Sequence, residues 1–127
     1  MHASSETCQW LWSKLLQKVT DEFMESRNAY RSRKDNKKAG PSGMSRNIAF
    51  SLPHTWGGKN CILPIDRDVV RQIKAEMGGD DILAFVDRDF ADRAETAYES
   101  LGIVDLNFNN VWSIFSRMLE IMWSTKL

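Results

Sequence analysis

The stretch VWSIFSRMLEIMW, from Val111 to Trp123, decides the fold. Its apolar residues recur three and four positions apart, which is the spacing of one face of an α-helix. They are Val111, Trp112, Ile114, Phe115, Met118, Leu119, Met122 and Trp123. Asn109 or Asn110 is expected to open this helix, because an Asn side chain can accept a bond from a free N–H of the first turn. A helix with such an apolar face requires other elements to cover it.

A second long helix is predicted from about Thr7 to about Lys34. One stripe at helical spacing is formed by Trp12, Leu15, Leu16, Val19, Phe23 and Tyr30. Thr7 is the predicted N-cap, because its hydroxyl can accept a hydrogen bond from the first turn. We expect the stripe to pack against the Val111–Met122 face, since these are the two longest apolar faces of the chain.

Two shorter helices are predicted between these long ones. Asp66 is the expected N-cap of the first, and Gly78-Gly79 its stop. The expected buried face of this helix is Val69, Val70, Ile73 and Met77. The second has its clearest part from Phe90 to Leu101 and contains alanines that allow close helix packing. The fold class is therefore predicted as mainly α, a small domain of about four helices.

A long irregular connection containing Pro and Gly is expected to join the two halves. We divide the chain into an N-terminal amphipathic helix with a basic end (1–38), an irregular loop region (39–64) and a C-terminal three-helix module (65–127), within one compact domain. Gly40-Pro41 must end the first helix, because Pro lacks a backbone N–H and restricts the residue before it. The short apolar runs Ile48–Leu52 and Cys61–Leu63 fit either short strands or a loop over the helices.

Composition limits the class of protein. The chain has 127 residues, of which 43% are apolar and 27% charged, the balance of one small globular domain. No window approaches the ~18 apolar residues of a membrane span, so no membrane association is expected. The N-terminus lacks the basic and apolar regions of a signal peptide. Cys8 and Cys61 are expected to be reduced thiols, which favours an intracellular location.

The charges are distributed unevenly. The whole chain is neutral, with 17 residues of each sign, yet residues 1–60 carry ten bases and five acids while residues 61–127 carry seven and twelve. The stretch Arg27–Asn47 holds seven bases and one acid. The bases are Arg27, Arg31, Arg33, Lys34, Lys37, Lys38 and Arg46. Such a run fits a nucleic-acid contact, a solvated linker, or attraction between the two halves of the chain.

No pattern typical of catalysis or of metal binding stands out. Acids such as Asp80-Asp81 and Asp87 precede expected helices, where they favourably meet the helix dipole. His2, Cys8, His54 and Cys61 lack the paired spacing of a zinc site. There is no phosphate-cradling glycine motif and no nucleophile in an elbow sequence. We therefore expect no enzyme activity, no metal site and no cofactor.

The basic stretch carries a resemblance. Its pattern is Asn28-x-x-Arg31-x-Arg33, followed by Pro41-x-Gly43 and then by Leu52-Pro53. This resembles the end of the integrase-like core of transposon-encoded proteins of the retroviral integrase type. There the final helix commonly ends in Trp-Asn-x-His-Arg-x-Arg, and some eukaryotic versions continue with a Pro-x-Gly turn and a Leu-Pro segment.

The match covers roughly the third of the chain that ends at Pro53, and it is incomplete. Arg27 stands at the Trp position of the family motif and Tyr30 at the His position. The family's transfer chemistry needs three carboxylates that hold two metal ions, and these precede the final helix. Few residues precede Trp10 here, so the resemblance implies a tail without the catalytic part.

Two functions follow as expectations. The first is a non-catalytic, transposon-derived helical module that contacts DNA weakly, without sequence preference, through the seven bases. A nuclear location would accompany it. The alternative is a helical protein-interaction or dimerisation module with no nucleic-acid role, in which the basic run is a linker. The sequence leaves open the DNA sequence preferred, the protein partner and the oligomeric state.

Overall fold

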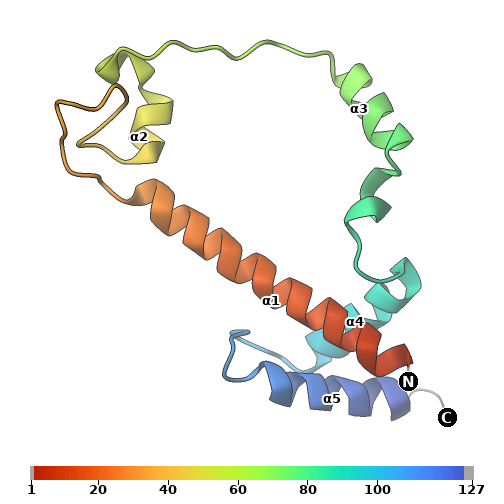
Figure 1. Ribbon diagram of the computed structural model, residues 1–127. Coiled ribbons are helices and arrows are strands. Elements are labelled where there is room, and N and C mark those ends of the chain that lie inside the picture. The colour runs from red at the N-terminus through yellow and green to blue at the C-terminus, as the bar shows by residue number, and fades with distance from the viewer. Residues whose placement is uncertain (1, 125–127) are drawn as a thin grey trace. The chain divides into compact units, whose positions relative to one another are not determined.

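The computed structural model describes residues 2–124 and is mainly helical. The prediction of a mainly α fold is therefore confirmed. Along the chain lie α1 (His2–Ala29), α2 (Arg46–Ser51), η1 (Pro53–Trp56), α3 (Arg67–Glu76), η2 (Gly79–Leu83), α4 (Arg88–Ser100) and α5 (Val111–Ser124) (Figure 1). Here η denotes a 3₁₀ helix. None of the helices in this described part has the length and apolar content required to cross a membrane.

The contacts divide the chain into two compact units. The helical unit comprises Met1–Lys18 and Asp66–Leu127, and the hairpin unit comprises Val19–Ile65. The helix α1 belongs to both, since its first part lies in the helical unit and its last turns in the hairpin unit. The sequence-based division placed boundaries at residues 38 and 64, whereas the structure places them at 18 and 65.

The core of the helical unit is formed by α1, α4 and α5. Its buried apolar side chains are Leu11, Leu15, Phe90, Ala94, Ala97, Leu106, Val111, Ile114, Met118 and Met122. The alanines lie on α4 and allow it to approach α5 closely, as predicted. Aromatic rings at the edge link α1 to α5, because the Trp12 and Trp112 ring centroids lie 5.5 Å apart. The first and last helices therefore contact each other, as predicted, at Trp12 with Trp112 and at Thr7 with Met122.

The N-terminal helix differs from the prediction in its ends. It begins at His2, so Thr7 is not an N-cap. Thr7 lies one and two turns before Leu11 and Leu15 on the same face, is fully buried, and donates its hydroxyl to Met122 Sδ at 3.8 Å. The helix ends at Ala29 rather than Lys34, because the backbone of Arg31 forms an antiparallel bridge with Ser45 instead of continuing the helix.

The predicted stripe on α1 is only partly buried. Leu15 is fully buried, but Leu16, Phe23 and Tyr30 are exposed. Phe23 and Tyr30 belong to the hairpin unit, because the helical unit includes α1 only as far as Lys18. The buried face is instead centred on Thr7, Leu11 and Leu15, at spacing i, i+4 and i+8.

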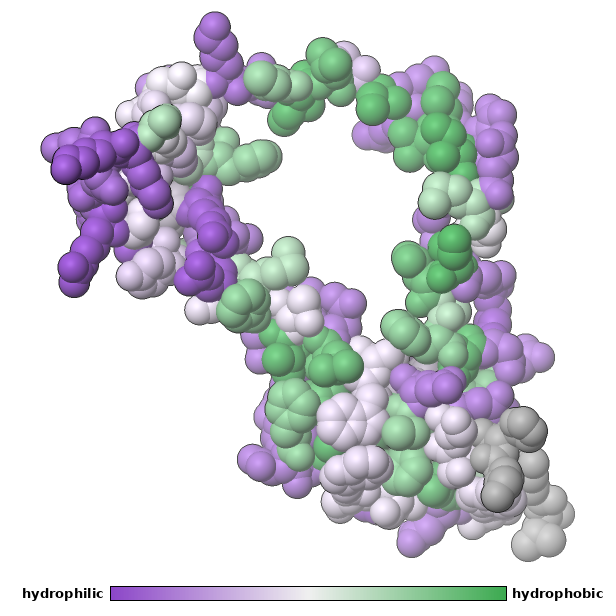
Figure 2. All heavy atoms as spheres, in the orientation of Figure 1, coloured by the Kyte–Doolittle hydropathy of each residue, from purple (hydrophilic) through white to green (hydrophobic). Residues whose placement is uncertain are grey.

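The ends of α3 were predicted correctly, but its buried face was not. Asp66 is the N-cap and accepts a bond from the Asp68 N–H at 2.8 Å, and the chain leaves the helix through Gly78, whose φ is +107°. The apolar face is about half exposed; its residues are Val69, Val70, Ile73 and Met77. Figure 2 shows hydrophobic side chains at the surface along this part of the chain. Within the described residues α3 packs mainly against the short η2, which is too small to cover it.

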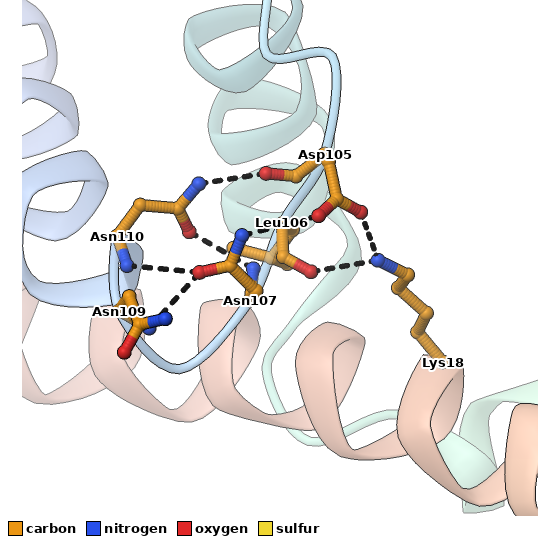
Figure 3. A network of polar contacts seen from close by, with 6 residues as sticks. All are labelled: Lys18, Asp105, Leu106, Asn107, Asn109 and Asn110. Carbon is orange, nitrogen blue, oxygen red and sulfur yellow. Dashed lines mark hydrogen bonds and ion pairs between the residues drawn. The ribbon is translucent and has the colours of Figure 1, made fainter.

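The loop before α5 is fixed by a network of asparagines and one lysine (Figure 3). Asn107 Oδ1 accepts bonds from the N–H groups of Asn109 (2.9 Å) and Asn110 (3.2 Å). The Asn110 amide donates to the Asp105 carbonyl at 2.7 Å. From α1, Lys18 Nζ donates to the Leu106 carbonyl at 2.8 Å and to the Asp105 carboxylate. The helix α5 starts directly after Asn110, one of the two residues predicted to open it.

This network predicts a pH effect on stability. Hydrogen bonds from Lys18 and then Asn107, with the charge of Lys18, lower the pKa of Asp105 below its usual value. A carboxyl whose pKa is lower in the folded state stabilises the fold above its unfolded pKa of about 3.9, and this stabilisation disappears as the pH falls through the folded pKa. We expect Asp105→Asn to flatten the loss of stability below about pH 4.

The measurement is urea unfolding between neutral and acid pH, followed by far-UV circular dichroism. Lys18→Met is the matched variant, because it removes the partner and leaves the carboxyl. In both variants, the free energy of unfolding should depend less steeply on pH in the acid range than it does in the parent. Acid profiles identical to that of the parent would contradict the assignment.

Candidate nucleic-acid interface

The basic run is a folded hairpin. After α1 the chain forms an antiparallel bridge between Arg31 and Ser45, and the Ser32 N–H donates to the Met44 carbonyl at 3.4 Å. Arg31 also closes the two arms, because its Nε donates to the Gly43 carbonyl at 2.8 Å. The run is therefore a hydrogen-bonded hairpin, whereas the sequence predicted an irregular connection from residue 39 onward.

The tip of the hairpin is organised by Asp35, the one acid of the stretch. Its carboxylate accepts the Lys37 N–H at 2.9 Å, and its carbonyl accepts the Lys38 N–H at 3.3 Å. The Ser42 hydroxyl accepts from the Asp35 N–H and donates to the Asp35 carbonyl, both at 3.0 Å. Asp35 thus satisfies backbone groups of the turn, and the neighbouring lysine side chains extend from a fixed backbone.

One glycine of the hairpin is required by its geometry. Gly43 has a φ of +75°, a conformation that L side chains rarely adopt. A Cβ at this position would also lie 3.1 Å from the Lys34 Cβ. The Pro41-x-Gly43 part of the sequence pattern therefore has a local structural cause.

The short helix α2 leads away from the hairpin. Ser45 is its N-cap, since the Ser45 hydroxyl accepts the Ile48 N–H at 3.2 Å, and Ser45 itself is buried. The apolar run Ile48–Leu52, for which strands were considered, belongs mostly to this helix. α2 and its cap hold Arg46 and Ala49 beside the end of the hairpin.

All seven predicted bases are exposed. Within residues 2–124, none of them pairs with a carboxylate, so their charges are available to an external anion. Figure 2 shows a predominantly hydrophilic surface over this part of the chain. The helical unit differs, because there Lys14 pairs with Glu95 at 3.0 Å and Lys74 with Asp80 at 2.5 Å.

Three of the seven bases meet at one place. Arg27 from the last turn of α1, Lys38 from the hairpin and Arg46 from α2 line a hollow of about 300 Å³. We call it the basic hollow. Its other lining residues are Tyr30, Ser32, Pro41, Met44, Ser45 and Ala49, so no carboxylate lines it. The remaining four bases, Arg31, Arg33, Lys34 and Lys37, lie outside its lining.

Several residues of this site were not predicted from the sequence. Tyr30 was assigned to an apolar stripe, but it is 63% exposed and lines the basic hollow. Ser32 and Ser45 were not considered at all. The order Ser45-Arg-Asn-Ile48 carried the signal of an N-cap before a short apolar run, and it could have located α2.

Trp56 is held in place by contacts within the hairpin unit. It remains 38% exposed, but its Nε1–H donates to the Ala49 carbonyl at 2.9 Å. Its six-membered ring lies against Gly58, where a Cβ would come within 2.5 Å of Cζ2. The ring is therefore fixed in orientation while part of it faces solvent.

The acidic clusters serve helix ends and ion pairs. Asp87 is the N-cap of α4 and accepts the Phe90 N–H at 2.9 Å, which confirms the capping interpretation. Asp81 pairs with Arg88 at 3.0 Å, and the bond and charge of Lys74 lower the pKa of Asp80. In the described part of the chain no three His, Cys, Asp or Glu side chains converge as metal ligands would.

Comparison with known proteins adds no assignment. Neither a protein-family model, nor a curated protein, nor a solved structure matches the chain.

Proposed function

We propose that this protein binds DNA without catalysing a reaction on it, through the hairpin and the basic hollow. The observation that carries the proposal is the convergence of Arg27, Lys38 and Arg46 on one hollow without a carboxylate in its lining. Three unpaired cations around a concave surface attract phosphate oxygens. Such contacts to the backbone give affinity without sequence information.

The resemblance of Asn28, Arg31 and Arg33 to the end of an integrase-like core supports a DNA partner and a nuclear location. Arg31 has a structural use that is independent of any ligand, because it bonds to Gly43 within the hairpin. We therefore assign the main phosphate contacts to the basic hollow. The bases at the hairpin tip are Arg33, Lys34 and Lys37, and they supply fewer phosphate contacts from outside the hollow.

The test is a binding titration with a short DNA duplex at low salt. Changing Arg27, Lys38 and Arg46 together to Gln should weaken binding by at least about tenfold, because three phosphate contacts are lost. The matched control removes three exposed bases of the helical unit, Arg67, Arg93 and Arg117, and should bind as the parent does. Equal binding by both triple variants would contradict the assignment to the hollow.

The exposed face of α3 favours a second candidate function, self-association with another copy of this chain. This face is formed by Val69, Val70, Ile73 and Met77, each about half exposed or more, and the charges near its two ends, Asp68 and Lys74, pair within the chain with Arg71 and Asp80. Val70 and Ile73 would then be covered by the partner copy. A concentration-dependent dimer mass, together with no DNA binding at low salt, would favour this function over the first.

A further inference from the structure

The basic hollow is one of three adjoining hollows around α2. The second, of about 580 Å³, shares Arg46 and Ala49 with the first and is also lined by Phe50 and Trp56. The third, of about 370 Å³, shares Ala49, Phe50 and Trp56 with the second and extends to Lys59. The three hollows adjoin through these shared residues of the hairpin unit, and we call them together the α2 surface.

Aromatic side chains are interleaved with bases along the α2 surface. Tyr30 is 63% exposed beside Arg27 and Lys38, and Phe50 is 81% exposed in the same lining as Arg46. Both rings are largely open to water and lie beside bases, which is the combination that surfaces binding single strands use for stacking and for backbone contact. The two rings and Trp56 come from the end of α1, from α2 and from η1.

The rings differ in how they are held. Trp56 is fixed by its bond to Ala49 and by its contact with Gly58. Phe50 projects from the six-residue helix α2, whose N-terminus is capped by Ser45. Trp56 and Phe50 are thus carried by backbone that is hydrogen-bonded within the hairpin unit.

We propose that the α2 surface binds single-stranded nucleic acid, with bases stacked on Tyr30 and Phe50 and phosphates beside Arg27, Lys38 and Arg46. This inference rests on the proposed function and specifies its ligand. Every base has a π-face, so stacking on aromatic side chains tolerates any sequence. In a duplex those faces are covered by neighbouring base pairs, and the two rings would find only sugar and phosphate.

The experiment uses the full chain and three probes of equal length: oligo-dT, oligo-rU, and oligo-dT paired with oligo-dA. Binding is followed by fluorescence anisotropy at one low salt concentration. Tighter binding of either single strand than of the duplex is expected, and the comparison of dT with rU distinguishes DNA from RNA as the ligand. Duplex binding as tight as that of both single strands would overturn the inference.

Substitutions of the aromatic rings test stacking without changing the charge of the protein. Phe50→Ala and Tyr30→Ala should each weaken single-strand binding by about five- to a hundredfold, while leaving duplex binding nearly unchanged. Tyr30→Phe keeps the ring and should bind as the parent does. Phe85→Ala is the matched control, since Phe85 is 71% exposed in the helical unit.

The two proposals fail in different ways. If the parent binds the duplex and the single strands alike, and Phe50→Ala has no effect, only the single-strand inference is overturned. If no probe binds at low salt, the proposed function fails and the inference fails with it. Far-UV circular dichroism of each variant checks that the helices persist.

Discussion

Leu15→Ala should lower the free energy of unfolding by about 2–5 kcal/mol, whereas Leu16→Ala should lower it by less than about 1 kcal/mol. The two residues are adjacent in α1 and undergo the same chemical change. Leu15 is fully buried in the helical unit, and Leu16 is 51% exposed. Truncating the buried side chain loses apolar contacts and leaves a cavity, but truncating the exposed one mainly alters solvent contacts.

Urea unfolding followed by circular dichroism measures both changes. If the two substitutions lower the free energy of unfolding by similar amounts, both side chains are buried. The wider stripe predicted from the sequence would then be the buried face of α1. The intermediate case is Phe115, which is only partly buried and stacks edge-on against Trp112 at 5.7 Å. We expect Phe115→Ala to cost less than Leu15→Ala, not the roughly 3–5 kcal/mol of a fully buried Phe.

Helix positions could be predicted from the sequence because their signals are local. Asp66 and Asp87 cap their helices through their own side chains, and Gly78 and Gly102 leave them with φ values of +107° and +60°. Each signal depends on a few consecutive residues and on backbone stereochemistry.

Burial was less predictable, because it depends on distant partners. Leu15 and Leu16 are both apolar and differ by 100° around the helix, so spacing alone could not show which one meets α5. Thr7 belongs to the buried face because Met122, 115 positions away, accepts its hydroxyl. The face of α3 has the ideal spacing for burial, yet no described element is large enough to cover it.

The candidate site also combines features that are local in the sequence with features that depend on distant residues. The seven bases could be counted in the sequence, and their exposure follows from their chemistry. Which of them converge depends on the hairpin, and so on the bonds that Arg31, Asp35 and Ser42 make across it. The Arg31–Gly43 and Ser42–Asp35 bonds join residues 12 and 7 positions apart, the Asp35–Lys37 bond joins residues two apart, and none of them follows a periodic pattern. Sequence reasoning therefore found the charge but not the hollow.

The salt dependence of DNA binding should be steep, and its slope reports how many of these bases meet phosphates. If about five of the seven do, the logarithmic slope for duplex DNA is near −4 to −5, and for a single strand about −3.5. Raising the salt from about 50 to about 200 mM should then weaken duplex binding by roughly several hundredfold.

Two triple variants locate those contacts. Changing the hollow bases Arg27, Lys38 and Arg46 to Gln should make the duplex slope shallower by about 2–3, because each lost contact removes about 0.9. Changing the tip bases Arg33, Lys34 and Lys37 to Gln removes the same charge from the same unit. It should change the slope by less, since these side chains lie outside the lining of the hollow.

Anisotropy titrations of the parent and both variants at four or more salt concentrations give the three slopes. Net charge alone cannot distinguish the variants, because each loses three positive charges. Equal slopes for the two variants would mean that the hairpin attracts DNA as a diffuse charge and that the hollow seats no phosphate. A parent slope near zero would show that the protein makes no phosphate contacts. Self-association through α3 would then be the better account of its function.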